Sequence, residues 1–88
     1  MIYTIKTHKS VDKFLSAHPE IVRHFIDKFS QIAKNPFTTA VDIKPLKWKT
    51  NNYRLRIGKY RFLYEIKNTE ILIRIWRADS RNSIYDTI

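Results

Sequence analysis

Hydrophobic positions in the first half of the chain follow a helical period. From Pro19 to Asn35 the apolar side chains recur every three or four residues, at Ile21, Val22, Phe25, Ile26, Phe29, Ile32 and Ala33. This spacing predicts an amphipathic helix that contributes one face to a core. Pro19 suits the first helical turn, and the Asn35–Pro36 pair ends the helix.

A strand and a shorter helix are predicted before this long helix. Residues 1–6 alternate loosely between apolar and polar side chains, which fits a short strand. Ser10 is a good N-cap residue, and the apolar residues that follow it fall on one side of a helix ending near His18.

The second half of the chain alternates with the period of two that is typical of β-strands. The predicted strands are Tyr53–Ile57, Tyr60–Ile66 and Ile71–Trp76. Turns separate them at Gly58–Lys59 and Asn68–Thr69, and residues 37–52 are predicted to be a loop. The order β-α-α-β-β-β indicates an α+β fold, a small antiparallel sheet with the two N-terminal helices packed on one face.

Length and composition restrict the class of protein. The 88 residues suit a single domain, 1–88. With no cysteine and no zinc-like histidine spacing, we expect no disulfide, no metal site and no cofactor. No apolar run approaches the roughly 20 residues of a membrane span. Residues 1–10 also lack the features of a secretory signal, so we expect a cytoplasmic protein without a membrane partner.

Positive charge is concentrated in the second half of the chain. Residues 1–43 hold six Lys/Arg and four Asp/Glu, a net of +2. Residues 44–81 hold eleven Lys/Arg and three Asp/Glu, a net of +8, within a total of +9. Such a distribution favours a polyanionic partner, either nucleic acid or an acidic protein segment, over a basic domain without a charged ligand.

Arginines recur on the predicted strands of this basic half. Arg54 and Arg56 alternate with apolar residues, so they share one face of their strand. If the apolar side packs on the helices, these two guanidinium groups line the open face, where they suit phosphate oxygens. Arg61 lies on the next strand and shares a face with Glu65, so the alternative for Arg61 is a structural ion pair.

The basic half resembles the RelE/ParE superfamily of bacterial toxins. The resemblance rests on the element order, the Leu46–Lys47 pair, the run YRLRIGKYRFLYEI and the later segment RNSIY. It implies a RelE-like fold and the toxin of a type II toxin–antitoxin system, held in a hetero-oligomer by a cognate acidic antitoxin. Toxins of the RelE branch cleave mRNA in the ribosomal A site and so inhibit translation, whereas those of the ParE branch inhibit DNA gyrase.

The resemblance to the ribosome-dependent nucleases also implies roles for individual residues. The implied catalytic residues are Arg61, Arg81 and Tyr85. The implied nucleic-acid-binding residues are Lys47, Lys49, Arg54 and Arg56.

The chemistry that the resemblance implies needs no metal. The 2′-hydroxyl of the RNA attacks the adjacent phosphorus, which gives a cyclic phosphate and a free 5′-hydroxyl. Arg61 and Arg81 would stabilise the charge that builds on the phosphate oxygens in the transition state. Tyr85 would either stack on a base or accept the hydroxyl proton.

The chain departs from the family pattern near its basic end. Asp79 and Ser80 stand where members often carry a glycine and a histidine or lysine. Asp79 would repel phosphate unless it is paired with an arginine, Arg77 or Arg81. First-strand lysines of the best-known nucleases are arginines here, and arginine stays protonated, so binding is better supported than catalysis.

Two other functions and one other pair of residues remain open. The chain is alternatively a ParE-like gyrase inhibitor, or a catalytically inactive basic module that only binds its antitoxin. Trp48 and Trp76 can stack on bases, although packing is the more frequent fate of tryptophan.

Overall fold

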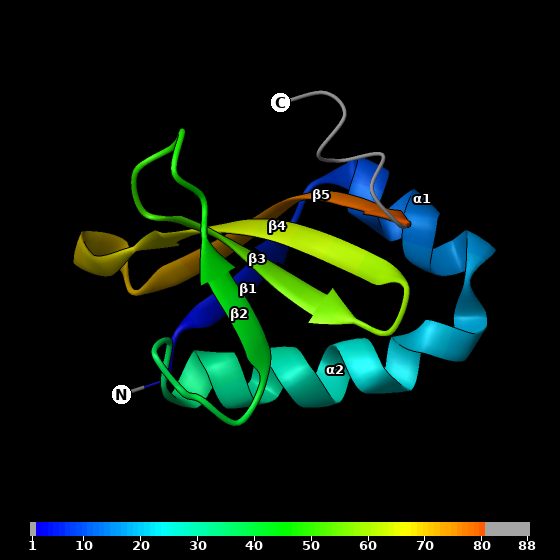
Figure 1. Ribbon diagram of the computed structural model, residues 1–88, viewed down its shortest axis with the longest axis horizontal. Helices are drawn as coiled ribbons and strands as arrows, with labels where there is room; N and C mark the ends of the chain where they lie inside the picture. The colour runs from blue at the N-terminus through cyan, green and yellow to red at the C-terminus, as the bar shows by residue number, and fades with distance from the viewer. Residues whose placement is uncertain (1, 81–88) are drawn as a thin grey trace.

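A mixed five-stranded sheet forms the centre of the computed structural model, which describes residues 2–80 (Figure 1). The strand order is β1-β5-β4-β3-β2. The strands are β1 (Thr4–Thr7), β2 (Asp42–Pro45), β3 (Asn52–Ile57), β4 (Tyr60–Lys67) and β5 (Leu72–Ser80). Two helices, α1 (Lys9–Ala17) and α2 (Pro19–Lys34), pack on one face of this sheet. The predicted α+β fold is therefore confirmed.

One strand of the sheet was missed by the sequence prediction. Residues 37–52 were expected to be a loop, but Asp42–Pro45 forms the edge strand β2 and pairs antiparallel with β3. The strand is only four residues long, and within it Ile43 alone packs against the core. A single inward residue gives no detectable period, and Pro45 is tolerated because β2 lies at the edge of the sheet.

The expectation of a wholly antiparallel sheet was also wrong. β1 pairs parallel to β5, with Ile5 opposite Ile73, while the other pairs are antiparallel. The two partners lie at opposite ends of the described chain. Such a non-local pairing leaves no local trace in the sequence from which its direction can be read.

A bulge interrupts the alternation of β5. Tyr64 of β4 lies opposite Ile75, but its neighbour Leu63 lies opposite Arg77, so Trp76 is the extra residue. A bulge of this kind redirects side chains at the point where it occurs. As a result, Trp76 and Arg77 both belong to the side of the sheet away from the helices.

The N-terminus of α1 differs from its predicted form. His8, rather than Ser10, is the N-cap, and its Nδ1 accepts a hydrogen bond of 3.1 Å from the Ser10 N–H. β1 runs to Thr7 and the helix starts at Lys9, which leaves His8 alone to make the turn.

No helix within residues 2–80 is long and apolar enough to cross a bilayer.

The core lies between the helices and the inner face of β3, β4 and β5. Its aromatic centre is Phe62, which is fully buried and contacts the rings of Phe14, Phe25 and Phe29 at centroid distances of 5.1–6.1 Å. Both helices contribute, because Phe14 comes from α1 and the other two rings from α2. Helix α2 is therefore core-forming, as its apolar stripe predicts.

A hydrogen bond joins α2 to the β3–β4 hairpin and makes stability depend on pH. The Tyr60 hydroxyl donates to Glu20 Oε2 at 2.8 Å, which lowers the pKa of Glu20 from its ordinary 4.5 and raises the pKa of Tyr60 from 10.0. The lowered Glu20 pKa adds stability above about pH 4.5 that is lost as the pH falls. The raised Tyr60 pKa adds stability below pH 10 that is lost as the pH rises through it.

Replacing Tyr60 by phenylalanine is therefore expected to lower stability at pH 7 and to matter less at pH 3. Urea denaturation of both proteins across this range measures the difference in unfolding free energy. A difference that stays constant with pH would contradict the assignment.

Candidate nucleic-acid interface

Charged residues gather on the face of the sheet that the helices leave uncovered. One row of directly opposed residues crosses four strands in the order Asp42, Arg56, Arg61 and Asp79. Residues opposed in this way present their side chains on the same face. The row therefore places two arginines side by side, with an aspartate at each end.

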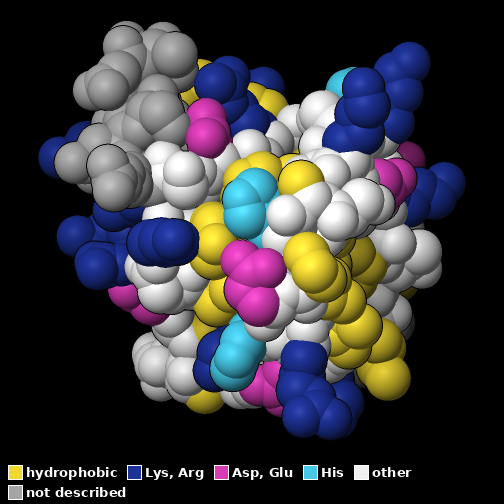
Figure 2. Space-filling model, turned by 90° about the vertical axis from the view of Figure 1, so that its right-hand side faces the viewer, with side chains coloured by type: hydrophobic (Ala, Val, Ile, Leu, Met, Phe, Trp, Pro, Cys, Tyr) yellow, Lys and Arg dark blue, Asp and Glu magenta, His cyan; other side chains and the backbone are white. Residues whose placement is uncertain are grey.

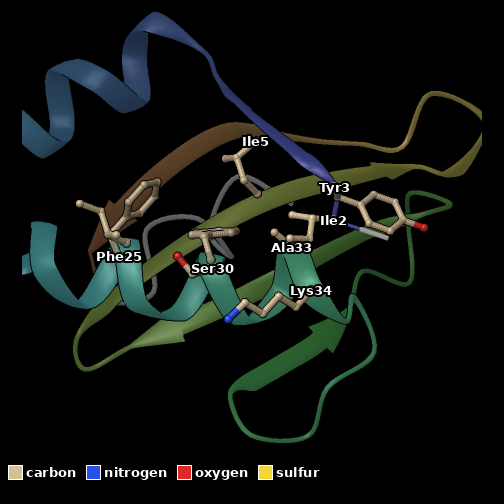
Figure 3. A pocket seen from close by; sticks show the side chains of 9 residues that line it. Ile2, Tyr3, Ile5, Phe25, Ser30, Ala33 and Lys34 are labelled. Carbon is tan, nitrogen blue, oxygen red and sulfur yellow. The ribbon is translucent and has the colours of Figure 1, made fainter.

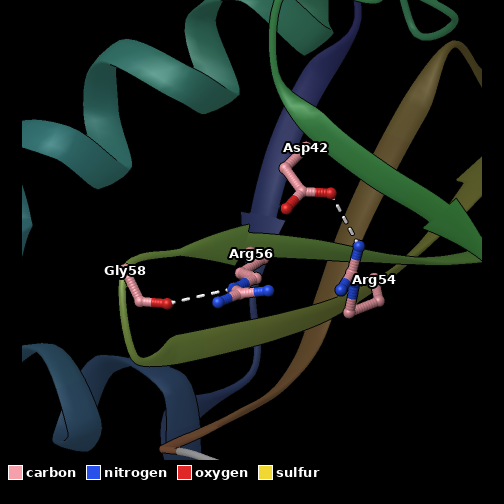
Figure 4. A network of polar contacts seen from close by, with 4 residues as sticks. All are labelled: Asp42, Arg54, Arg56 and Gly58. Atoms are coloured by element: carbon pink, nitrogen blue, oxygen red, sulfur yellow. Dashed lines mark hydrogen bonds and ion pairs between the residues drawn. The ribbon is translucent and has the colours of Figure 1, made fainter.

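The two central arginines repel each other. Arg56 and Arg61 are directly opposed across β3 and β4, and like charges at such positions destabilise a sheet. Arg56 is exposed and its Nε donates to the Gly58 carbonyl at 3.3 Å, which holds the side chain along the hairpin (Figure 4). Arg61 is half-buried. An anion lying between them would relieve the repulsion.

Arg54 does not lie in the position expected of a phosphate ligand. Its side chain is only 6% exposed, and its Nη2 forms an ion pair of 2.8 Å with Asp42 Oδ1 (Figure 4). Its Nε is buried without a hydrogen-bond partner among the described residues. Alternation correctly places Arg54 on the outer face, but its side chain is buried there and is paired with Asp42 of β2. The structure therefore places Arg56 and Arg61 side by side on the outer face, where Arg54 is buried and ion-paired.

The Arg54–Asp42 pair predicts an asymmetry between two substitutions. Asp42→Ala leaves a guanidinium charge buried without its partner and should cost about 1–3 kcal/mol. Arg54→Met fills the same space with an apolar chain and leaves only a half-exposed carboxylate, so the loss should be smaller. Urea denaturation measures both, with Glu70→Ala in the exposed pair Lys67–Glu70 as a control expected to change little. Equal losses for the two variants would argue against a buried charge at Arg54.

Asp79 contacts two residues of its own strand, Arg77 and Ser80. Its Oδ2 lies 3.9 Å from Arg77 Nη2, and its Oδ1 accepts a hydrogen bond from the Ser80 N–H at 2.8 Å. Of the two arginines that could offset its charge, Arg77 is paired with it among the described residues. Its carboxylate is thereby turned toward its own strand.

Two of the predicted catalytic residues, Arg81 and Tyr85, lie outside the described residues. β5 carries the chain as far as Ser80, which lies opposite Tyr60. The preceding residue, Asp79, lies opposite Arg61. The described chain thus ends beside the row that contains Arg61.

The two predicted lysines lie in the loop between β2 and β3. Lys47 and Lys49 are both exposed, and the loop projects beyond the edge of the sheet (Figure 1). Asn52 follows the loop and is in phase with Arg54 and Arg56, so it opens on the same face. The four residue steps from Asn52 to Arg56 separate the loop from the arginine row by about 13 Å along the strand.

Two of the histidines, His8 and His18, have structural contacts. His18 stacks on Phe14 with a centroid distance of 4.3 Å, and its Nδ1 lies 2.9 Å from the Phe14 carbonyl oxygen. Figure 2 shows the side of the molecule that lies to the right in Figure 1, where acidic and histidine side chains gather at the centre and Lys and Arg lie at the margins. No group of three or more His, Cys, Asp or Glu within residues 2–80 is placed to hold a metal.

An apolar groove lies between β1 and α2, on the side of the sheet that carries the helices. It has a volume of about 390 Å³, and Figure 3 shows side chains from both elements along it. Two of its lining residues, Ile2 and Ile26, are 68% and 58% exposed. Exposed apolar residues around a groove are typical of a surface that binds another protein.

Sequence reasoning missed two residues that organise the interface, Asp42 and Asn52. Asp42 lies twelve positions before Arg54, too far for any local pattern to connect them. Asn52 was assigned to the loop, although its phase with Arg54 and Arg56 would have extended the strand by one residue. The alternation of Asn52 with Arg54 and Arg56 was the signal from which its place on the strand could have been predicted.

Comparison with known proteins assigns a class to this arrangement. No protein-family model matches the chain, and no curated protein matches it. The archaeal RelE–RelB complex from Pyrococcus horikoshii OT3 is similar at 28% identity and a TM-score of 0.82, over 94% of this chain and 99% of that one. The RelB–RelE complex from Methanococcus jannaschii is similar at 29% identity and a TM-score of 0.72, over 94% and 98% of the two chains.

A more distant structure shares the fold alone. A mutant of the E. coli toxin RelE in the free state has 11% identity and a TM-score of 0.74, over 98% of this chain and 90% of that one. The chain therefore has a small α+β fold of the kind found in these solved structures. More particularly, the fold is RelE-like, and the resemblance to RelE seen in the sequence is confirmed by the similarity to the RelE–RelB structures.

Proposed function

We propose that this chain is the toxin of a type II toxin–antitoxin system and acts as a ribosome-dependent endonuclease of mRNA. The observation that carries the proposal is the Arg56–Arg61 pair, two opposed guanidinium groups on the uncovered face of the sheet. Similarity to the RelE chains of two archaeal RelE–RelB complexes supports it. The cell compartment would be the cytoplasm, where ribosomes and mRNA are found.

The proposed reaction is an internal transfer on the RNA backbone. The 2′-hydroxyl attacks the neighbouring phosphorus and the bond to the 5′-oxygen breaks, which leaves a cyclic phosphate and a free 5′-hydroxyl. Arg61, joined by Arg81, stabilises the charge on the phosphate oxygens, and this donor set needs no metal. Arg56 holds an adjacent phosphate, and Tyr85 stacks on a base or accepts the hydroxyl proton.

The position of Arg54 changes its proposed role. Arg54 is buried and ion-paired with Asp42, so it links β2 to β3, the strand that carries Arg56. The phosphate contacts assigned to Arg54 from the sequence would then fall to Arg56, Lys47 and Lys49.

An acidic antitoxin is the second proposed partner. An acidic segment would neutralise the arginine row, and apolar side chains would fill the groove between β1 and α2. The proposal is thus a hetero-oligomer in which the antitoxin competes with RNA for the basic face.

Induced expression with mapping of transcript ends tests the proposed activity. We expect new 5′ ends within the codons of translated messages and none in the same messages when their start codons are removed. Intact transcripts accompanied by a DNA-damage response and blocked supercoiling would instead indicate gyrase inhibition. The absence of any growth defect would indicate a module that only binds its antitoxin.

A further inference from the structure

Trp48 is an exposed aromatic side chain held in a fixed position. It lies in the loop between β2 and β3, and 49% of its surface is exposed. Its ring meets Trp76 edge-to-face, with a centroid distance of 6.3 Å and an interplanar angle of 88°. This contact uses only part of the Trp48 ring, so a large apolar surface remains open to solvent.

The loop is held in place by Asn52, a polar residue that is only 2% exposed. Its side-chain Nδ2 donates to the Thr50 carbonyl at 2.8 Å, and its Oδ1 accepts from Trp76 Nε1 at 2.7 Å. Its backbone carbonyl accepts from the Leu46 N–H at 2.9 Å, and its own N–H donates to the Lys49 carbonyl at 3.3 Å. One residue thus joins both ends of the loop to the sheet.

This anchoring lowers the cost of using the loop for binding. A side chain that is already ordered loses little conformational entropy when a ligand arrives. Asn51 completes the turn with a left-handed φ of 60°, a conformation that asparagine adopts more readily than most residues. The loop therefore presents Trp48 as a preformed surface.

Positive charge surrounds the exposed ring. Lys47 and Lys49 flank Trp48 in the chain and are both exposed. Lys49 Nζ also lies 4.4 Å from the centroid of the Trp76 ring, a cation–π contact that keeps the ammonium beside the aromatic pair. An aromatic face between two cations is the combination that binds single-stranded nucleic acid, because the bases stack and the phosphates pair with lysine.

The position of this loop relates it to the arginine row. Asn52, Arg54 and Arg56 lie on one face of β3, so the loop and the row open in the same direction. About 13 Å separates them along the strand. A short single-stranded segment of RNA bound at the arginines can therefore reach the loop without bending around the sheet.

We propose that Trp48 is a stacking platform for an unpaired base of RNA that also contacts the Arg56–Arg61 row. Lys47 and Lys49 hold the phosphates on either side of that base. The inference rests on the proposed function and adds a binding subsite to it. Stacking on a ring face tolerates every base, so the subsite supplies affinity and register rather than sequence preference.

The test compares two short RNA probes. One is a single-stranded oligoribonucleotide of adenosines, and the other is an oligomer of the same length with abasic riboses. We expect Trp48→Ala to weaken binding of the first by about tenfold and of the second by less than twofold. Trp48→Phe should retain most of the affinity, and binding of the adenosine oligomer should quench the tryptophan fluorescence of the wild type more than that of Trp48→Phe.

Four results would overturn the inference. Equal affinity of the wild type and Trp48→Ala for adenosine RNA would exclude stacking, while the proposed function would stand if Arg61→Ala still lost binding. Equal loss on both probes would show that Trp48 only supports the loop. Loss of affinity for the copurified antitoxin alone would assign the ring to the protein partner. If the wild type binds neither probe, this inference fails, while the mapping of transcript ends decides the proposed ribosome-dependent function separately.

Discussion

Replacing Arg61 by alanine is expected to abolish toxicity while leaving the fold intact. Arg61 supplies one of the two opposed guanidinium groups on the uncovered face. Loss of one donor that stabilises transition-state charge typically lowers a rate by about a hundredfold or more. Growth after induced expression measures toxicity. Cleavage of a message by the purified protein, in the presence of isolated ribosomes that translate it, measures the activity.

Two further variants make the result specific to position and geometry. Arg61→Lys keeps the charge but loses the planar fork, so we expect it to restore only part of the activity. Arg23→Ala removes the same charge from an exposed position on α2 and should leave cleavage unchanged. Circular dichroism should show native folding for all three. Full toxicity of a folded Arg61→Ala protein would remove the residue from the mechanism.

Replacing Phe62 by alanine is expected to lower the free energy of unfolding by about 3–5 kcal/mol. Phe62 is fully buried, and its ring meets those of Phe14, Phe25 and Phe29. Its removal opens a cavity that both helices border, and the loss is a large part of the roughly 5–15 kcal/mol that stabilises a small domain. Urea denaturation measures the change.

The same substitution at an exposed site provides the control. Phe37 is 65% exposed, so Phe37→Ala should change stability by less than about 0.5 kcal/mol. Phe62→Leu should fall between the two, because leucine fills part of the space. A Phe62→Ala protein as stable as the Phe37→Ala protein would contradict the central position of the ring in the core.

The helical half of the fold could be predicted because its signal is long. The apolar stripe of α2 repeats over sixteen residues, whereas β2 has four residues and one inward side chain. Detection by periodicity needs several repeats, so the long helix was recognised and the short edge strand was not. The failure to predict β2 also affected the prediction of the site, because β2 carries Asp42, the carboxylate that pairs with Arg54.

The candidate site could be predicted only as far as alternation reaches. Alternation placed Arg54 and Arg56 on the outer face correctly, but it says nothing of what covers that face. The ion pair of Arg54 depends on Asp42, and the placement of Trp76 depends on a bulge between Leu63 and Tyr64 of the neighbouring strand. Both arise from the register between paired strands, which is set by the whole sheet rather than by the sequence of one strand.

The parallel contact between β1 and β5 also bears on how this chain is synthesised. β5 lies between β1 and β4, so the earliest strand to leave the ribosome has no neighbour in the sheet until one of the latest follows it. A nascent chain that stops before Leu72 lacks the segment that joins β1 to the β2–β4 sheet. Interrupted translation would therefore release fragments without a continuous sheet, which ties the appearance of a folded domain to nearly complete synthesis.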